Sequence, residues 1–349
     1  MNWKHVVVFF GTLAALVVFL WPSDDLDDSP RQSASRISKK SSKKSTPSSS
    51  KKSKRTAVSR ARDVESPGTY SYSKKREDCT KHDRYLDVLK GLGLQLDQHL
   101  RDYGSISADE ESRIGEKAIE EAPMRFGGTL RRSGQMVDYL MGVARPMLKH
   151  VKRKDISYRF YVLEGASIEN AFALPGGHIL FTEAFLDSWI SNEAQLATIV
   201  GHEIAHVDLG HPVAVLNWVR ALGLPEKDQG TEFLLRMARS PYSSVLEEEA
   251  DDVGAELLHE VGYSVFQSVA VWENRLGKPG SSQDRAPENI LDTIKLELEG
   301  LKQTHPNEAR RACRLRQKAY DLYAKDPLTR PYVGKKNWRM RKALSERVY

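Results

Sequence analysis

The segment SNEAQLATIVGHEIAHVDLG, residues 191–210, constrains the fold more than any other part of this 349-residue chain. It predicts a helix that Ser191 can cap, that carries Glu193 in its first turn and that stops at Gly210. Apolar side chains occupy most of its circumference, so the helix has to be buried on nearly every side. These apolar residues are Ile199, Val200, Ile204, Ala205 and Val207.

The same helix carries His202, Glu203 and His206 in the pattern H-E-x-x-H. Positions i and i+4 differ by about 6 Å of rise and about 40° of rotation, so both imidazoles can reach one tetrahedral Zn²⁺. Glu203 lies beside the first histidine, where its carboxylate can take a proton from a water that the metal activates. The alternative, two surface histidines on an amphipathic helix, is disfavoured because the helix is largely apolar. We therefore predict one zinc ion per chain.

A third metal ligand is expected from the downstream acidic segment LEEEADDVGAELL. By spacing alone, Glu247, Glu248 or Glu249 can serve. If Glu247 is the ligand, Asp251 lies one helical turn further on, where it can accept the remaining N–H of a ligating histidine. Gly254 lies close to the same face, where the absence of a side chain would let this helix pack tightly against the first.

These motifs resemble the gluzincin zinc metallopeptidases, a family that includes the HtpX, BepA, mitochondrial OMA and CAAX prenyl protease types. The resemblance runs from about residue 107 to 320 and has four matches in order: ENAFALPGGHILFT, NEAQLATIVGHEIAH, PYSSVLEEEADDVG and THPNEARR. The family pattern Glu-x-x-Ala-Asp implies that Glu247 is the third ligand and that Asp251 orients a ligating histidine. Ser244 departs from the family, in which Arg is frequent at this position, so we expect one substrate-side or structural contact of the family site to be absent.

The resemblance also implies the rest of the active site. His305 and Arg311 match the pair that stabilises the oxyanion of the tetrahedral intermediate, with Arg310 as the alternative if the spacing slips by one. An edge strand is expected to pair with an extended peptide substrate. Its residues are Asn170, Ala171, Phe172 and Ala173. Three further histidines lie outside the motifs and are not expected to bind zinc: His178, His211 and His259.

The flanking sequence predicts an α+β fold, namely a mostly helical zincin-type metallopeptidase domain with a small mixed β-sheet, over residues 77–325. ISADEESRIGEKAIEE predicts a helix capped by Ser107, and RSGQMVDYLMGVARPMLKHVKR has apolar residues at helical spacing. ISYRFYVLEG and GGHILFT are typical of strands. Further helices are predicted at about 231–239, 244–260, 264–275, 286–303 and 307–324.

The N-terminus contains an uncharged apolar run from Val6 to Trp21. It is short for a spanning helix and long for the core of a signal peptide. Leu20, Trp21 and Pro22 stand where a cleavage site requires small residues, so we favour an uncleaved membrane anchor over residues 1–22. Because large C-terminal domains translocate largely regardless of nearby charge, we expect a single-pass protein with its catalytic domain on the extracytoplasmic, periplasmic side.

Residues 23–76 predict a disordered Ser/Lys-rich linker, and residues 326–349 a basic C-terminal tail. Within the linker, the tract 38–55 holds seven Lys, one Arg and no acid. Without these eight cations the formal net charge changes from +6 to −2, so the folded part gives no support for nucleic-acid binding. A solvated spacer is the favoured interpretation of the Lys clusters, and contact with an anionic lipid or envelope polymer is the alternative.

The only two cysteines, Cys79 and Cys313, lie far apart in the sequence and form no Cys-x-x-Cys motif. They can pair in an oxidising compartment, or each can be buried as a small apolar residue. We favour the unpaired state, because cysteine is commonly buried without being bonded.

The sequence therefore predicts a membrane-tethered zinc endopeptidase that acts on protein or peptide substrates. The resemblance implies that these are damaged or misfolded membrane and envelope proteins. The alternative is a tethered chaperone or binding module that keeps the fold without turnover, but a pure binder has no need of the base Glu203.

Overall fold

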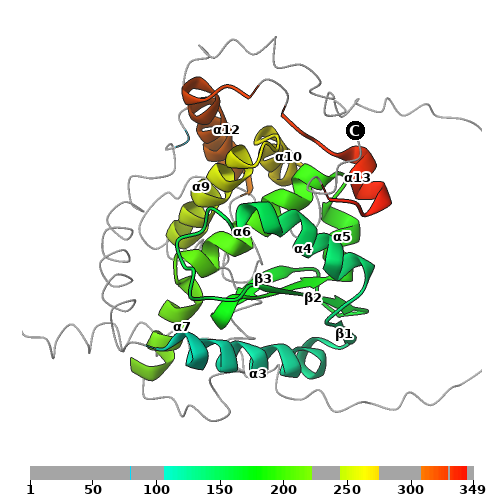
Figure 1. Cartoon of the computed structure of the whole chain (residues 1–349), viewed down its shortest axis with the longest axis vertical. Coiled ribbons are helices and arrows are strands. Elements are labelled where there is room, and N and C mark those ends of the chain that lie inside the picture. Colours follow the sequence, from blue (N-terminus) through cyan, green and yellow to red (C-terminus); the bar gives the residue numbers. More distant parts are fainter. Residues whose placement is uncertain (1–78, 80–105, 222–243, 275–307, 329–330, 344–349) are drawn as a thin grey trace, which may run out of the picture. The chain divides into compact units, whose positions relative to one another are not determined.

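The computed structural model describes Cys79 and residues 106–221, 244–274, 308–328 and 331–343 (Figure 1). Four strands form a mixed sheet in the order β1-β2-β4-β3, in which only β2 and β4 run parallel. The strands are β1 (Thr129–Arg131), β2 (Arg159–Glu164), β3 (Ala171–Leu174) and β4 (His178–Thr182). The helices are α3 (Ala108–Phe126), α4 (Gln135–Met147), α5 (Glu183–Trp189), α6 (Glu193–Asp208), α7 (His211–Ala221), α9 (Ser244–Glu260), α10 (Phe266–Glu273), α12 (Glu308–Lys325) and α13 (Lys335–Met340).

The predicted α+β class is confirmed, and both faces of the sheet are covered. Helices α4 and α6 lie over one face and α3 lies over the other (Figure 1). Along β2, Phe160 and Val162 join the core below α4 and α6, whereas Tyr161 and Leu163 join a second core against α3. The alternation of this strand therefore distributes apolar side chains between two cores, as expected for a strand buried on both faces.

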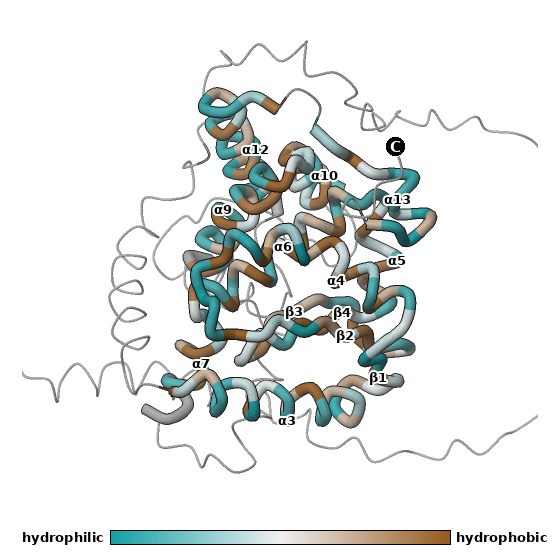
Figure 2. The backbone as a smooth tube through the Cα atoms, viewed as in Figure 1, coloured by the Kyte–Doolittle hydropathy of each residue, from teal (hydrophilic) through white to brown (hydrophobic). Residues whose placement is uncertain are grey.

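Helix α3 begins at the predicted cap, where the side chain of Ser107 accepts a hydrogen bond from the backbone N–H of Glu110 at 3.2 Å. Hydrophilic and hydrophobic residues alternate along this helix (Figure 2). Its buried side faces the sheet and includes Ile119 and Phe126. The pattern of α3 is thus that of a surface helix, and it covers the sheet opposite the candidate metal centre.

Helix α6 is buried along its whole length, as the apolar sequence predicts. Its cap is Asn192 rather than Ser191, because the Asn192 side chain accepts a hydrogen bond from the backbone N–H of Gln195 at 3.0 Å. Ser191 instead donates from its hydroxyl to Oε1 of Gln195. The helix ends at Asp208, and Gly210 follows with a φ of 75°, a left-handed conformation that favours glycine.

Helix α9 spans the predicted residues and packs directly on α6. The contact favours glycine, since a Cβ at Gly254 would lie 3.1 Å from the backbone nitrogen of His202 and 3.2 Å from the carbonyl carbon of Gly201, which is tighter than most Cβ contacts. The close approach predicted for Gly254 is therefore confirmed. It brings the first turns of α9 next to the histidine motif.

Residues 331–343 fall within the range expected to be a basic tail, but they are folded onto the domain. The carbonyl oxygens of Val333 and Gly334 accept hydrogen bonds from the backbone N–H groups of Ala194 and Glu193, which open α6. Trp338 on α13 is largely buried against Tyr139 of α4. This segment thus satisfies N–H groups that the first turn of α6 would otherwise leave without a helical partner.

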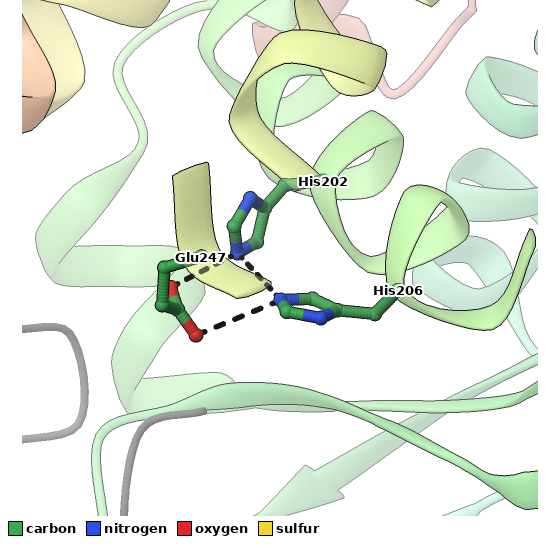
Figure 3. A group of neighbouring side chains, drawn as sticks. All are labelled: His202, His206 and Glu247. Atoms are coloured by element: carbon green, nitrogen blue, oxygen red, sulfur yellow. Dashed lines mark hydrogen bonds and ion pairs between the residues drawn. The ribbon is translucent and has the colours of Figure 1, made fainter. Parts of the chain in front are cut away.

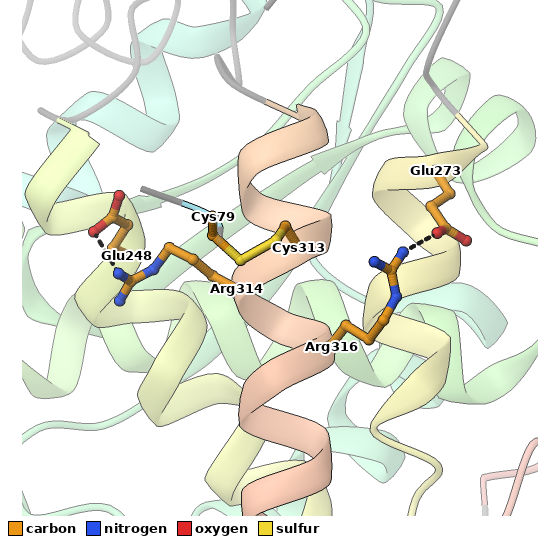
Figure 4. Close-up of a disulfide and its surroundings, with 6 residues drawn as sticks. All are labelled: Cys79, Glu248, Glu273, Cys313, Arg314 and Arg316. Carbon is orange, nitrogen blue, oxygen red and sulfur yellow. Dashed lines mark hydrogen bonds and ion pairs between the residues drawn. A yellow bond between two sulfur atoms is a disulfide. The ribbon is translucent and has the colours of Figure 1, made fainter. Parts of the chain in front are cut away.

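Cys79 and Cys313 form a disulfide with Cα atoms 5.9 Å apart, which corrects the expectation that they are unpaired (Figure 4). Cys313 lies on α12, and the bond connects residues 234 positions apart in the sequence. Ion pairs hold the same helix to its neighbours: Arg314 pairs with Glu248 of α9 at 3.3 Å, and Arg316 pairs with Glu273 of α10. A bond of this kind depends on tertiary proximity, which the spacing of two cysteines does not reveal.

Several predictions fall outside the described residues: the anchor, the linker and the helices at about 231–239 and 286–303. Among the residues that are described, no helix combines the length and the hydropathy needed to cross a bilayer.

Candidate metal centre

His202, His206 and Glu247 are brought together from two helices (Figure 3). The Nε2 atoms of the two histidines, one turn apart on α6, lie 3.0 Å from each other. Glu247, in the first turn of α9, places Oε2 3.4 Å from Nε2 of His202 and Oε1 3.6 Å from Nε2 of His206. All three side chains are buried. The three residues expected as ligands therefore converge on one point.

The geometry of these donor atoms fits a zinc ion. Two ligand atoms about 2.0–2.1 Å from a tetrahedral metal lie about 3.3–3.4 Å from each other. The three distances given above, 3.0, 3.4 and 3.6 Å, bracket that value. Two imidazoles and one carboxylate are also the ligand set of many catalytic zinc sites, which leave one position open.

Asp251 occupies the place expected for the residue that orients a ligating histidine. Its Oδ1 lies 3.1 Å from Nδ1 of His202. Arg311 of α12 donates from Nε and Nη2 to the two carboxylate oxygens of Asp251, at 2.7 Å each. Nη1 of Arg311 lies 2.8 Å from Oε2 of Glu247, and its guanidinium carbon lies 3.8 Å from the ring centroid of Trp272. One buried cation thus holds both acidic residues of the centre in position.

These contacts raise the pKa values of His202 and Arg311 and lower that of Asp251. Burial acts to lower the pKa of His202, but hydrogen bonds to Asp251 and Glu247 outweigh it and raise that pKa to about 9. Burial acts to raise the pKa of Asp251, but the Arg311 guanidinium outweighs it and holds that pKa below its usual range. Burial acts to lower the pKa of Arg311, but the charges of Asp251 and Glu247 outweigh it and raise that pKa.

Glu203 is buried between α6 and the sheet. Burial raises the pKa of its carboxyl group to about 7, and the charge of Glu247 acts in the same direction. The charges of His202 and Arg311 and a hydrogen bond from the backbone N–H of Ala173 act to lower it. A carboxyl group with a pKa near neutrality is suited to accept a proton and then to release it.

Strand β3 forms one edge of the four-stranded sheet, as expected for the substrate strand, and β1 forms the other. Opposite Thr182, the carbonyl of Asn170 accepts the backbone N–H of Thr182 at 2.9 Å, and the N–H of Asn170 donates to Oγ1 of Thr182 at 3.0 Å. Antiparallel pairing alternates from residue to residue, so the N–H and C=O groups of Ala171 and Ala173 point away from β4. The backbone groups of Asn170, and by the same alternation those of Phe172, therefore face β4. Two of the four expected residues, Ala171 and Ala173, have backbone groups that point outward.

The other candidate residues take different places. His305 lies outside the described residues. His178 contacts Tyr161 and the carbonyl of Ser112, and His259 contacts the carbonyl of Asp326. Neither belongs to the metal-binding group found among the described residues.

His211 was not expected to bind zinc and is not a member of the ligand group found among the described residues, but it lies against His206, with its Nδ1 2.7 Å from Nδ1 of that residue. Its position directly after Gly210, where the chain reverses from α6 into α7, is the one sequence signal that could have indicated this contact.

Comparison with known proteins identifies a peptidase family whose matched region contains the three grouped residues His202, His206 and Glu247. The sequence model described as Peptidase family M48 matches residues 137–319. The chain is 25% identical over 207 residues to the Beta-barrel assembly-enhancing protease of Escherichia coli, covering 54% of this chain and 42% of that protein. It is 26% identical over 184 residues to the Mitochondrial metalloendopeptidase OMA1 of Schizosaccharomyces pombe, covering 50% and 54%.

A third relative, the Metalloprotease LoiP of Escherichia coli, is 28% identical over 139 residues. The chain spans about half the length of these curated relatives. The matched family region begins in α4 and ends in α12, so it contains His202, Glu203, His206, Glu247 and Arg311. This chain belongs to peptidase family M48, a family of metal-dependent peptidases.

Proposed function

We propose that this chain is a zinc-dependent endopeptidase. The observation that carries the proposal is the convergence of two imidazole nitrogens and one carboxylate beside a second, buried carboxylate, that of Glu203. A module that only binds its partner needs no group beyond the three metal ligands, whereas hydrolysis also needs a base next to them.

Each residue has its own role in the reaction. His202, His206 and Glu247 would hold the zinc ion, which when bound polarises the scissile carbonyl and makes a water more acidic. Glu203 takes the proton of that water on its carboxylate and later delivers it to the leaving nitrogen. An extended substrate pairs with the outward N–H and C=O groups of Ala171 and with the outward C=O group of Ala173, beside Phe172. The N–H group of Ala173 donates to Glu203 instead.

Stabilisation of the oxyanion of the tetrahedral intermediate is assigned to His305. Arg311, which the family resemblance placed in the same role, is assigned to holding Glu247 and Asp251, because its Nε, Nη1 and Nη2 atoms contact these carboxylates. Asp251 fixes the orientation of His202 by accepting a hydrogen bond from its Nδ1–H group.

Removal of the metal should abolish activity. The purified full-length chain should contain about one zinc ion and digest casein, and a chelator should stop the digestion until zinc is restored. Glu247→Gln should lower the zinc affinity, because a neutral amide is a much weaker ligand than a carboxylate.

Glu248→Gln is the matched control. Glu248 is the neighbouring acid on α9, but it pairs with Arg310 and Arg314 of α12. Zinc lost from Glu248→Gln and retained by Glu247→Gln would overturn the ligand assignment. Digestion that is unaffected by the chelator would overturn the proposal as a whole.

For the cellular role we propose quality control of membrane or envelope proteins by a catalytic domain tethered on the extracytoplasmic side. One relative is named as a protease that enhances β-barrel assembly, which supports this role. The tether would consist of the apolar run from Val6 to Trp21 and the Ser/Lys-rich linker.

The anchor gives a direct prediction. If residues 6–21 remain in the mature protein as a membrane helix, the chain should stay in the membrane pellet after a carbonate wash and after high salt. Attachment through the Lys clusters alone would be released by salt, since that attraction is screened within about a Debye length. A mature N-terminus after Trp21 would contradict the anchor. Protection of the linker from protease in intact spheroplasts would reverse the orientation.

A further inference from the structure

The second ring nitrogen of His206 contacts another histidine. Nε2 of His206 faces Glu247 and His202, and Nδ1 points away from them (Figure 3). Nδ1 lies 2.7 Å from Nδ1 of His211, whose side chain is fully buried. Nε2 of His211 in turn lies 3.3 Å from Oε2 of Glu249, the side chain of which is 34% exposed.

The order of these contacts fixes the position of each proton. A histidine that binds metal through Nε2 carries its proton on Nδ1, so His206 donates from Nδ1 and His211 accepts on Nδ1. A neutral His211 then carries its own proton on Nε2, the atom that faces Glu249. The reverse assignment would put a proton on the nitrogen of His206 that faces Glu247 and would exclude it as a ligand.

Helix α9 therefore supports both histidine ligands. Asp251 contacts Nδ1 of His202 directly. Glu249, two residues after Glu247 on the same helix, reaches the Nδ1 atom of His206 through the ring of His211. His211 can bridge this gap because the left-handed turn at Gly210 places the first residue of α7 back against the last turns of α6.

We propose that His211 is a positioning residue of the metal centre, which orients His206 by accepting a hydrogen bond from its Nδ1–H group and by donating one from its own Nε2–H group to Glu249. This inference rests on the proposed zinc site. The general effect of such partners is to fix the tautomer and the ring orientation of the ligand, and their loss lowers metal affinity by about 10- to 100-fold.

The test measures zinc affinity of the purified full-length chain by competition with a fluorescent chelator. His211→Leu fills the space but accepts no hydrogen bond, and it should bind zinc about 10- to 100-fold more weakly than the natural chain. His211→Asn retains an acceptor near the position of Nδ1 but loses the link to Glu249, so its affinity should fall between the two. A packing role alone would predict the opposite order, with Leu tolerated better than Asn at a fully buried position.

His178→Leu is the matched control. His178 is also fully buried, and both of its ring nitrogens contact polar groups, but those groups are Tyr161 and Ser112. This variant should lose stability and keep its zinc affinity within about twofold, because these two partners lie on β2 and α3 and not on the helices that carry the ligands. Glu249→Gln, which removes only the charge at the end of the chain of contacts, should weaken zinc binding less than His211→Leu does.

The outcomes separate this inference from the proposed function. Zinc binding by His211→Leu that equals that of the natural chain would overturn the role of His211 and leave the peptidase proposal intact. Absence of zinc from the natural chain would overturn both. If His211→Leu does not fold, the Asn variant and Glu249→Gln decide the question, and unchanged zinc affinity in both would overturn the inference.

Discussion

Glu203→Gln should reduce the rate of peptide hydrolysis at least about 10²-fold and leave zinc bound. The substitution preserves the size of the side chain and can still accept the hydrogen bond from the Ala173 N–H group, but an amide takes up no proton from the attacking water. Zinc content should stay near one per chain, because Glu203 lies beside the group of ligands and is not a member of it. The measurement is casein digestion together with metal analysis of the same sample.

Glu193→Gln provides a control on the same buried helix. Glu193 accepts hydrogen bonds from the hydroxyl groups of Tyr139 and Tyr263, at 2.7 and 2.8 Å, at the opposite end of α6. Its loss should lower thermal stability but leave the rate per folded molecule within about twofold. Equal and slow digestion by the natural chain and Glu203→Gln would favour the alternative of a binding module that keeps the fold without turnover.

The histidine helix could be predicted from the sequence because its information is local. The apolar run, the polar residues that precede it and the glycine that follows it all lie within one segment, and α6 has nearly the expected ends. The cap was misplaced by one residue, since Ser191 and Asn192 are both competent caps and the choice depends on how the chain enters the helix.

The third ligand was harder to predict, because it depends on the rotation of α9 about its own axis. Glu247, Glu248 and Glu249 are equally good ligands by composition, yet Glu248 faces the arginines of α12 and Glu249 faces His211. The rotation is set where Gly254 meets the backbone of α6. That glycine was the one local signal of the orientation, and without the family pattern it would not have separated the three acids.

Contacts between distant segments were not predictable from local pattern. The disulfide joins Cys79 to α12, and the carbonyls of Val333 and Gly334 meet the start of α6 from a segment whose basic composition is typical of a tail. The pairing of Asn170 with Thr182 likewise decides which groups of β3 face outward, and sequence alone does not fix the register of a strand pair.

Arg311→Met should destabilise the protein by about 3–5 kcal/mol and should also weaken zinc binding. Loss of a residue that acts only in the transition state would lower turnover alone. Methionine fills the space over Trp272 but leaves the buried carboxylates of Glu247 and Asp251 without the cation that now contacts both. Removing one partner of a buried ion pair leaves a charge that has lost its hydration without compensation, and this is the costly case. Arg311→Lys should fall in between, because an ammonium keeps the charge but lacks the planar fork that meets both oxygens of Asp251.

Arg316→Met on the same helix is the control for this prediction. Arg316 pairs with Glu273 near the surface, with 29% and 46% of the two side chains exposed, and its loss should change the free energy of unfolding by at most about 1 kcal/mol. Urea unfolding and zinc competition should be measured on both variants and on the natural chain. If Arg311 acts only in the transition state, Arg311→Met should keep the stability and the zinc affinity of the natural chain while its turnover falls. That result would show that Arg311 stabilises the oxyanion. Loss of stability and of metal together would show that the arginine acts through the position of Glu247 and Asp251, which sets the geometry of the ligands before any substrate binds.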